Sequence, residues 1–173
     1  MTRRAVAALT ASDVQLLDAR TGATRAVMPI SQGCTADAAA ADELVAVLEL
    51  CAGERVRLAA VDPETGRPYW TRDLTYRRPQ EWPPAEGADP RRDLDVATAA
   101  DGTVLVRLSG TSYLYASGGR RLLADIHGAN WGYSTRSPVV TGAGVVAHTS
   151  IPDGGEGGYV QGVDPATGAI RWT

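Results

Sequence analysis

Apolar and polar residues alternate with a period of two in short runs along the whole chain. In "ERVRLAAV" the apolar residues Val56, Leu58 and Ala60 alternate with Arg55, Arg57 and Ala59, which is the pattern of a half-buried β-strand. Similar runs of five to eight residues recur from one end to the other. Only the Ala-rich stretch "TADAAAADELVAVLEL" is compatible with a helix, and no long segment keeps the 3.6-residue period. The pattern therefore predicts an all-β protein.

A turn motif separates some of these strands and is repeated. "VDPETGRPYW" begins at Val61 and returns as "VDPATGAIRW" from Val163 and, in weaker form, as "LDARTGATRA" from Leu17. Pro fixes φ, Gly accepts positive φ, and Asp and Thr bond to nearby backbone groups, so the motif predicts a tight hairpin corner. The tryptophan at its end has enough apolar area to pack against a neighbouring unit. The corner residues are Asp18, Thr21 and Gly22; Asp62, Thr65, Gly66 and Trp70; and Asp164, Thr167, Gly168 and Trp172.

The spacing of these corners gives the number of units. Asp62 follows Asp18 by 44 residues, and Asp164 follows Asp62 by 102, or two steps of 51. A third, degenerate copy, "SYLYASGGRRLL" from Ser112, lies halfway between Asp62 and Asp164. Repeats of this length built from short strands suggest the blades of a propeller. We expect an incomplete blade at 1–30 that starts at its second strand, a blade at 31–74, a long inter-blade loop at 75–93, a degenerate blade at 94–128 and a blade at 129–173.

The corner pattern A-x-D-x-x-T-G-x-x-x-W resembles the repeat of pyrroloquinoline-quinone (PQQ) enzymes and their non-enzymatic relatives. The first corner departs from it by having Ala26 in the tryptophan position. The resemblance implies a partial β-propeller of about four four-stranded antiparallel blades, the first incomplete, as an open arc of a seven- or eight-bladed wheel. Such dehydrogenases carry a calcium site, a catalytic Asp and adjacent cysteines, none of which can be matched here. We therefore expect no cofactor and no enzymatic activity; a fragment of a quinone-dependent dehydrogenase is the alternative.

Composition narrows the choice of partner. The formal net charge is −3, the sequence pI is about 5.4, and all 17 basic residues are arginine. This balance argues against a nucleic-acid-binding face, which needs concentrated basic charge. The Arg and Ala bias is typical of a GC-rich bacterial genome. No apolar run approaches the roughly 18 residues of a membrane span, and the run from Ala5 to Leu9 is shorter than a signal-peptide core.

Other motifs favour structural explanations. "VVTGAGVVA" matches a dinucleotide fingerprint but continues into β-branched residues instead of a helix, which favours a hairpin turn. Asp153 and Glu156 in "PDGGEGG" are calcium-type ligands, although two carboxylates fall short of the six or so oxygens that calcium needs, which favours a solvated loop. His127 and His148 have no metal-ligand spacing around them. We predict no catalytic or metal-binding residue.

The long connections suggest a recognition face. In a four-stranded meander the corners share one end, and the segments 75–93, 127–136 and 150–158 belong at the opposite end. The first two of these segments carry Trp and Arg, which are enriched at contact hot spots. We expect a scaffold or sensor that binds a protein or ligand there, with a purely structural module as an alternative; the partner is a protein or a second copy of the chain, with no nucleic acid and no membrane insertion. The candidate contact residues are Arg77, Arg78, Trp82, Arg91, Arg92, Trp131, Tyr133 and Arg136.

The two cysteines give a geometric prediction. If the hairpin after Cys34 turns at Asp42–Glu43, opposed residue numbers add up to 85, as Cys34 and Cys51 do. Opposed Cα atoms lie about 4.5–5.5 Å apart, within disulfide range. The alternative is two free buried thiols. A disulfide would place the chain outside the cytoplasm or at the cell surface, with the export signal outside these residues; without it, the chain is cytoplasmic. We also expect the isolated arc to self-associate or aggregate.

Overall fold

The computed structural model describes residues 5–52, 55–75, 94–108, 111–123, 139–140, 146–150, 159–163 and 170–172. These residues form fifteen β-strands in four antiparallel sheets, and no helix occurs among them. The first sheet has three strands, and each of the other three has four. The fold is therefore all-β, as the alternating pattern predicted. No helix that could cross a membrane is found in the described part of the chain.

Within each sheet the strands follow one another in chain order, as a meander. The first sheet contains β1 (Ala5–Leu9), β2 (Asp13–Asp18) and β3 (Thr24–Pro29). The second contains β4 (Cys34–Ala40), β5 (Val45–Cys51), β6 (Arg55–Val61) and β7 (Pro68–Thr75). The third contains β8 (Leu94–Thr98), β9 (Val104–Leu108), β10 (Thr111–Tyr115) and β11 (Arg121–Leu123). The fourth contains β12 (Val139–Val140), β13 (Val146–Ser150), β14 (Tyr159–Val163) and β15 (Ile170–Trp172).

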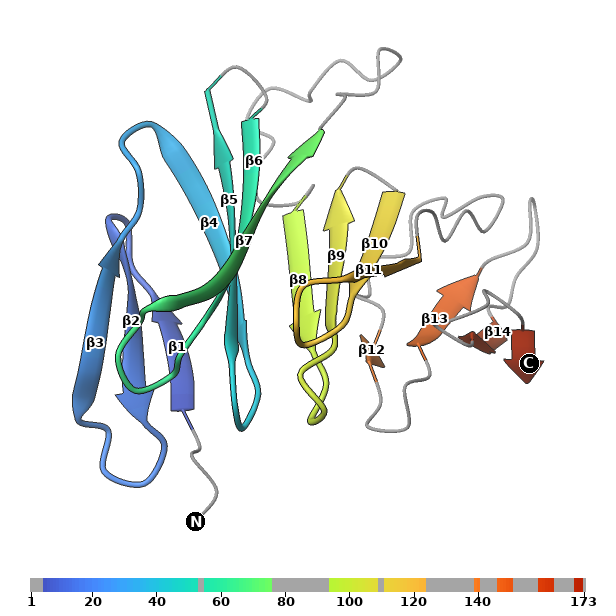
Figure 1. Cartoon of the computed structure of the whole chain (residues 1–173), viewed down its shortest axis with the longest axis horizontal. Coiled ribbons are helices and arrows are strands. Elements are labelled where there is room, and N and C mark those ends of the chain that lie inside the picture. Colours follow the sequence, from blue (N-terminus) through green and yellow to red (C-terminus); the bar gives the residue numbers. More distant parts are fainter. Residues whose placement is uncertain are drawn as a thin grey trace.

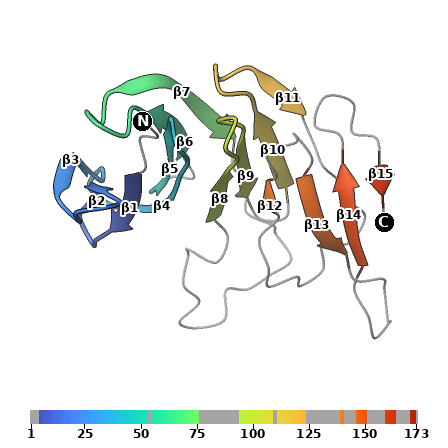
Figure 2. The same ribbon diagram turned by 90° about the horizontal axis from the view of Figure 1, so that it is seen from below.

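The four sheets are arranged as the blades of a propeller. In Figure 2 they fan out like spokes, with β4, β8 and β12 at the inner ends and β3, β7, β11 and β15 at the outer ends. The inner strands contact one another in order, β1 with β4, β4 with β8 and β8 with β12. The first and last blades lie at opposite ends of the row (Figure 1). The chain thus forms a partial propeller.

The core is split into layers between the blades, and β5 shows why. Residues Leu44 to Leu48 are all buried, because β5 is covered on both faces. Successive side chains of a strand point to opposite faces. Accordingly Leu44, Ala46 and Leu48 pack in the cluster shared with β8–β10, and Val45 and Val47 pack in the cluster shared with Val14 and Leu16 of the first blade.

A further bond joins the inner ends of two blades. The carboxylate of Asp37, on β4, accepts a hydrogen bond from the backbone N–H of Val96 on β8, at 3.0 Å. Its other oxygen accepts from the N–H of Ala38 at 2.9 Å. Because Asp37 bonds to a strand of the next sheet, it fixes the height of one blade relative to the other.

The turns divide between the two ends of the blades. The corners after β2 and β6 and the turn between β4 and β5 lie at the lower end in Figure 1, whereas β3 joins β4 at the upper end. The strands β7 and β8, which residues 76–93 connect, also end and begin there. We call these the corner end and the long-connection end.

Candidate interaction surface

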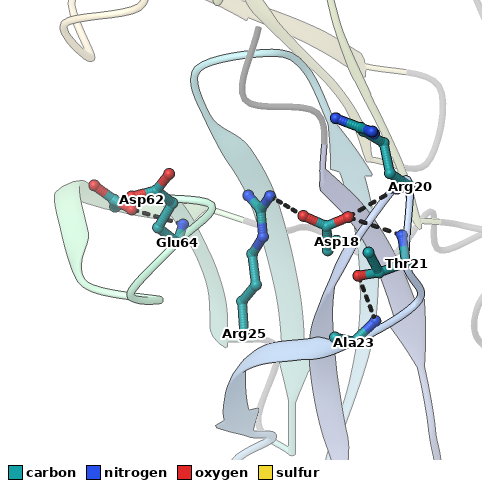
Figure 3. A network of polar contacts seen from close by, with 7 residues as sticks. All are labelled: Asp18, Arg20, Thr21, Ala23, Arg25, Asp62 and Glu64. Atoms are coloured by element: carbon teal, nitrogen blue, oxygen red, sulfur yellow. Dashed lines mark hydrogen bonds and ion pairs between the residues drawn. The ribbon is translucent and has the colours of Figure 1, made fainter. Parts of the chain in front are cut away.

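The first corner is closed by the side chain of Asp18 (Figure 3). One carboxylate oxygen accepts hydrogen bonds from the backbone N–H groups of Arg20 and Thr21, both at 2.9 Å. The other oxygen pairs with the guanidinium of Arg25. Gly22 has φ of +70°, a region that glycine enters without steric cost, and its N–H donates to the carbonyl of Asp18 at 2.8 Å.

The second corner has the same construction. Asp62 accepts from the N–H groups of Glu64 at 2.7 Å and Thr65 at 3.0 Å, and Gly66 has φ of +69°. Here the second oxygen accepts from the hydroxyl of Tyr69 at 3.0 Å. Tyr69 stands seven residues after its Asp, as Arg25 does, so position seven of the repeat supplies a donor to the corner carboxylate.

These bonds give the corner aspartates a structural role. The Arg25 guanidinium and the two backbone N–H groups hold the pKa of Asp18 well below its ordinary value of 3.8, because all three favour the ionised form. The carboxylate is therefore already engaged within its own turn. Among the described residues there is also no group of three or more His, Cys, Asp or Glu side chains that could hold a metal ion.

The boundary between the second and third blades, which we call the second seam, is filled by Trp70. The indole lies over the corner glycine of the next blade, so closely that a Cβ on Gly119 would come within 2.7 Å of the ring. Its Nε1–H donates to the carbonyl of Ser117 at 2.6 Å. The ring centroid is 5.9 Å from that of Tyr115, whose phenol pKa is raised, mainly by burial. The repeat tryptophan thus joins its own blade to the next corner.

The boundary between the first and second blades, the first seam, is built differently. The residue equivalent to Trp70 is Ala26, and a Cβ on Gly66 would meet the side chains of Met28 at 3.2 Å and Ala26 at 3.3 Å. Beside this contact is a groove of about 220 Å³. Its floor contains the buried Val14, Val47 and Val61. The other lining residues are Met28, Pro29, Ser31, Glu49, Arg57, Ala59, Gly66, Pro68 and Thr71.

Polar groups gather where the groove nears the long-connection end. Glu49 on β5 is directly opposite Arg57 on β6. Its carboxylate accepts from the backbone N–H of Ser31 at 3.2 Å and from the Ser31 hydroxyl at 3.5 Å. The groove therefore has an apolar floor and an anionic acceptor at one end.

The disulfide lies at the same end of the second blade. Cys34 and Cys51 are opposed in the β4–β5 register and are joined, with Cα atoms 4.0 Å apart. The pairing is the one that the hairpin geometry predicted. The bridge joins the first residue of β4 to the last residue of β5. It therefore braces the strand ends that flank the long-connection end.

The structure describes only some of the remaining predicted site residues. Trp172 is on β15 with 47% of its surface exposed, and His148 is on β13. The third corner has Ala116 in place of Asp and keeps a glycine, Gly119, at φ of +77°. The following lie outside the described residues: Arg77, Arg78, Trp82, Arg91, Arg92, His127, Trp131, Tyr133, Arg136, Asp153, Glu156, Asp164, Thr167 and Gly168.

Sequence reasoning noticed Ala26 as a departure from the repeat but did not infer the groove. In the structure the side chains of Met28 and Ala26 lie against Gly66, where the indole of Trp70 lies against Gly119 at the second seam. The groove lies beside Met28, and this packing could not be inferred from the sequence.

The hairpin corners repeat, a corner glycine packs against the preceding blade at both seams, and the antiparallel sheets radiate as blades. These features define a β-propeller of PQQ-like repeats. The sequence profile of the family described as "Outer membrane protein assembly factor BamB" matches residues 10–173, and the chain belongs to this PQQ-like propeller family. No curated protein sequence matches the chain significantly.

Solved structures support the fold. BamB from Moraxella catarrhalis is similar with a TM-score of 0.53 and 22% identity, over 99% of this chain and 49% of that one. A protein of unknown function from Bacteroides caccae is similar with a TM-score of 0.55 and 12% identity, over 99% of this chain and 57% of that one. The chain thus spans about half the length of these structures.

Proposed function

We propose that this chain is a non-catalytic propeller module that binds a protein partner at its long-connection end. The observation that carries the proposal is the difference between the two ends. At the corner end, the Asp18 and Asp62 carboxylates bond to the backbone of their own turns. At the other end, the disulfide braces β4 and β5 of the blade whose last strand, β7, ends where residues 76–93 begin.

The sequence of that connection supports the same role. Residues 76–93 contain four arginines and Trp82, and Arg and Trp are enriched among the residues that dominate binding energy. A long connection on a rigid scaffold is a common location for binding residues. The matched family is described as an assembly factor for outer membrane proteins, so we propose a protein of the cell envelope as the partner.

Residues 76–93 are to be replaced by a short Gly-Ser linker and the protein used as bait in cross-linked extracts of its own cells. A control variant changes the exposed corner residues Glu64 and Arg67 to Ser. We expect the wild type and the control to retain the same envelope protein and the linker variant to lose it, with an unchanged circular dichroism spectrum. Retention by the linker variant would refute the proposed surface.

We also propose that the module works outside the cytoplasm, because disulfides persist in oxidising compartments. Alkylation of intact cells followed by mass spectrometry should find Cys34 and Cys51 unmodified. Alkylation of both would contradict this location. A titration with PQQ and calcium addresses catalysis separately: we expect no shift of the quinone absorbance, and a shift would favour a dehydrogenase.

A further inference from the structure

Three arginines gather at the outer edge of the second seam. Arg72 stands on β7 two residues after Trp70, so the two side chains share one face of the strand. Its Nε–H donates to the carbonyl of Gly119 in the third corner at 3.2 Å. Arg120 and Arg121 follow that glycine directly, and all three arginines are exposed. Because β7 and β11 are the outer strands of their blades (Figure 2), we call these three residues the rim arginines.

Two of the rim arginines lie over aromatic rings. The guanidinium carbon of Arg72 is 5.9 Å from the ring centroid of Trp70, and that of Arg121 is 4.9 Å from the ring centroid of Tyr113. Arginine stacks favourably on aromatic faces at such distances. Burial raises the pKa of the Tyr115 phenol, and the charges of Arg121 and Arg72 act against this rise. Both positive charges therefore lie near the same phenol.

Arg72 is held in place and still has donors to offer. Its Nε–H is used by the Gly119 carbonyl, and its Nη1 donates to the carbonyl of Thr71 at 2.8 Å. A guanidinium carries five N–H donors in a planar fork, so further donors remain. Because these bonds already fix the plane of the guanidinium, a ligand that binds to it loses less side-chain entropy. The site is thus preorganised for an oxyanion.

We propose that the rim arginines bind a short acidic segment of a partner protein. A guanidinium matches a carboxylate in a bidentate geometry, and arginine, tryptophan and tyrosine are the residues that dominate protein contacts. The formal net charge of the chain is −3, so an extended anionic surface, such as a membrane or a nucleic acid, is repelled by the rest of the molecule. A narrow acidic segment meets the arginines alone. None of these arginines belongs to residues 76–93, so this surface is separate from the one proposed above.

The test measures the fluorescence anisotropy of a fluorescein-labelled peptide of alternating glutamate and glycine at about 20 mM salt, where exposed charges are weakly screened. We expect saturable binding that weakens as salt is added, and no binding of the same peptide with glutamine in place of glutamate. A Kd above about 1 mM for the glutamate peptide would overturn the proposal. Sedimentation of the chain with phosphatidylserine vesicles would also overturn it if the loss of the rim charges abolished it, because the ligand would then be a membrane surface.

Two double variants separate the site from the net charge. Arg72→Gln with Arg120→Gln should weaken binding about tenfold, at roughly threefold for each exposed ion pair. The matched control, Arg55→Gln with Arg67→Gln, removes the same charge from exposed positions on β6 and the second corner and should stay within about twofold of wild type. An equal loss in both double variants would refute the site. Arg120→Gln alone leaves the bond from Arg72 to Gly119 in place and should still weaken binding about threefold, which distinguishes lost binding from a loosened seam. All variants keep residues 76–93, so the result does not depend on that connection.

Discussion

Replacing Trp70 by alanine should destabilise the chain by an amount that the structure allows us to calculate. A buried tryptophan side chain removes about 150–250 Å² from water, which at about 25 cal/mol per Å² corresponds to roughly 5 kcal/mol. Trp70 is only partly buried, so we take about half of this value, or about 2.5 kcal/mol. The bond from Nε1 to the Ser117 carbonyl contributes about 1 kcal/mol. The expected loss is about 3.5 kcal/mol.

Urea and thermal unfolding followed by circular dichroism measure this loss. For a chain of this length the melting temperature should fall by about 7–14 °C, at roughly 2–4 °C per kcal/mol. Trp70→Phe keeps most of the apolar area and loses the N–H, so it should cost about 1 kcal/mol. The exposed Val27 is the surface control, and Val27→Ala should stay within about 0.5 kcal/mol of wild type. A loss below about 1 kcal/mol for Trp70→Ala would refute the idea that the indole joins the two blades.

Three further predictions concern the corners and the disulfide. Gly119→Ala should destabilise the chain clearly more than Gly22→Ala. Both glycines have positive φ, but a Cβ at Gly119 would meet the indole of Trp70, whereas nothing lies within 4 Å of a Cβ at Gly22. Equal losses of stability in urea unfolding would contradict the packing of Trp70 on Gly119. The pKa of Asp18 lies below its ordinary value of 3.8, so the stabilisation by its carboxylate is present above pH 3.8 and is lost as the pH falls through the lower pKa of the folded state. Asp18→Asn should therefore weaken the dependence of the urea midpoint on pH between about pH 5 and pH 1. An unchanged dependence on pH would count against the ion pair with Arg25. Replacing both Cys34 and Cys51 by Ser should cost about 3 kcal/mol, and the same loss should follow reduction of the wild type; a stability unaffected by reductant would show that the bridge does not constrain the unfolded chain.

Much of the fold could be read from local patterns. The alternation in Arg55–Val61 predicted β6, because only a period of two places Val56 and Leu58 on one face and the arginines on the other. The hairpin register followed from a turn at Asp42–Glu43, and it predicted the Cys34–Cys51 pairing that the structure has. These features depend on residues close in sequence, which is why the sequence was sufficient.

Contacts between blades were not accessible in this way. The bond from the Val96 N–H to Asp37 joins residues 59 positions apart, and nothing in the composition of "CTADAAA" distinguishes this Asp from a solvated one. The donor at position seven was also missed, because Arg25 and Tyr69 share no chemistry beyond a group that can donate to a carboxylate. Only the geometry of the two corners shows that Arg25 and Tyr69 donate to the corner carboxylate in the same way.

Departures from the repeat differ in their consequences, and the difference is physical. The third corner has lost both the Asp and the Thr, yet it closes through backbone bonds alone: the Ala116 N–H donates to the Arg120 carbonyl and the Gly119 N–H to the Ala116 carbonyl, at 2.9 and 2.8 Å. A backbone bond can replace a side-chain bond at a corner because every residue carries the same donor and acceptor. No backbone group can replace the volume of an indole, and at the first seam the side chains of Met28 and Ala26 lie against Gly66 in its place. A loss of polar motif residues is therefore compensated by the backbone of the same turn, whereas the loss of one large residue at a blade boundary has to be compensated by other side chains.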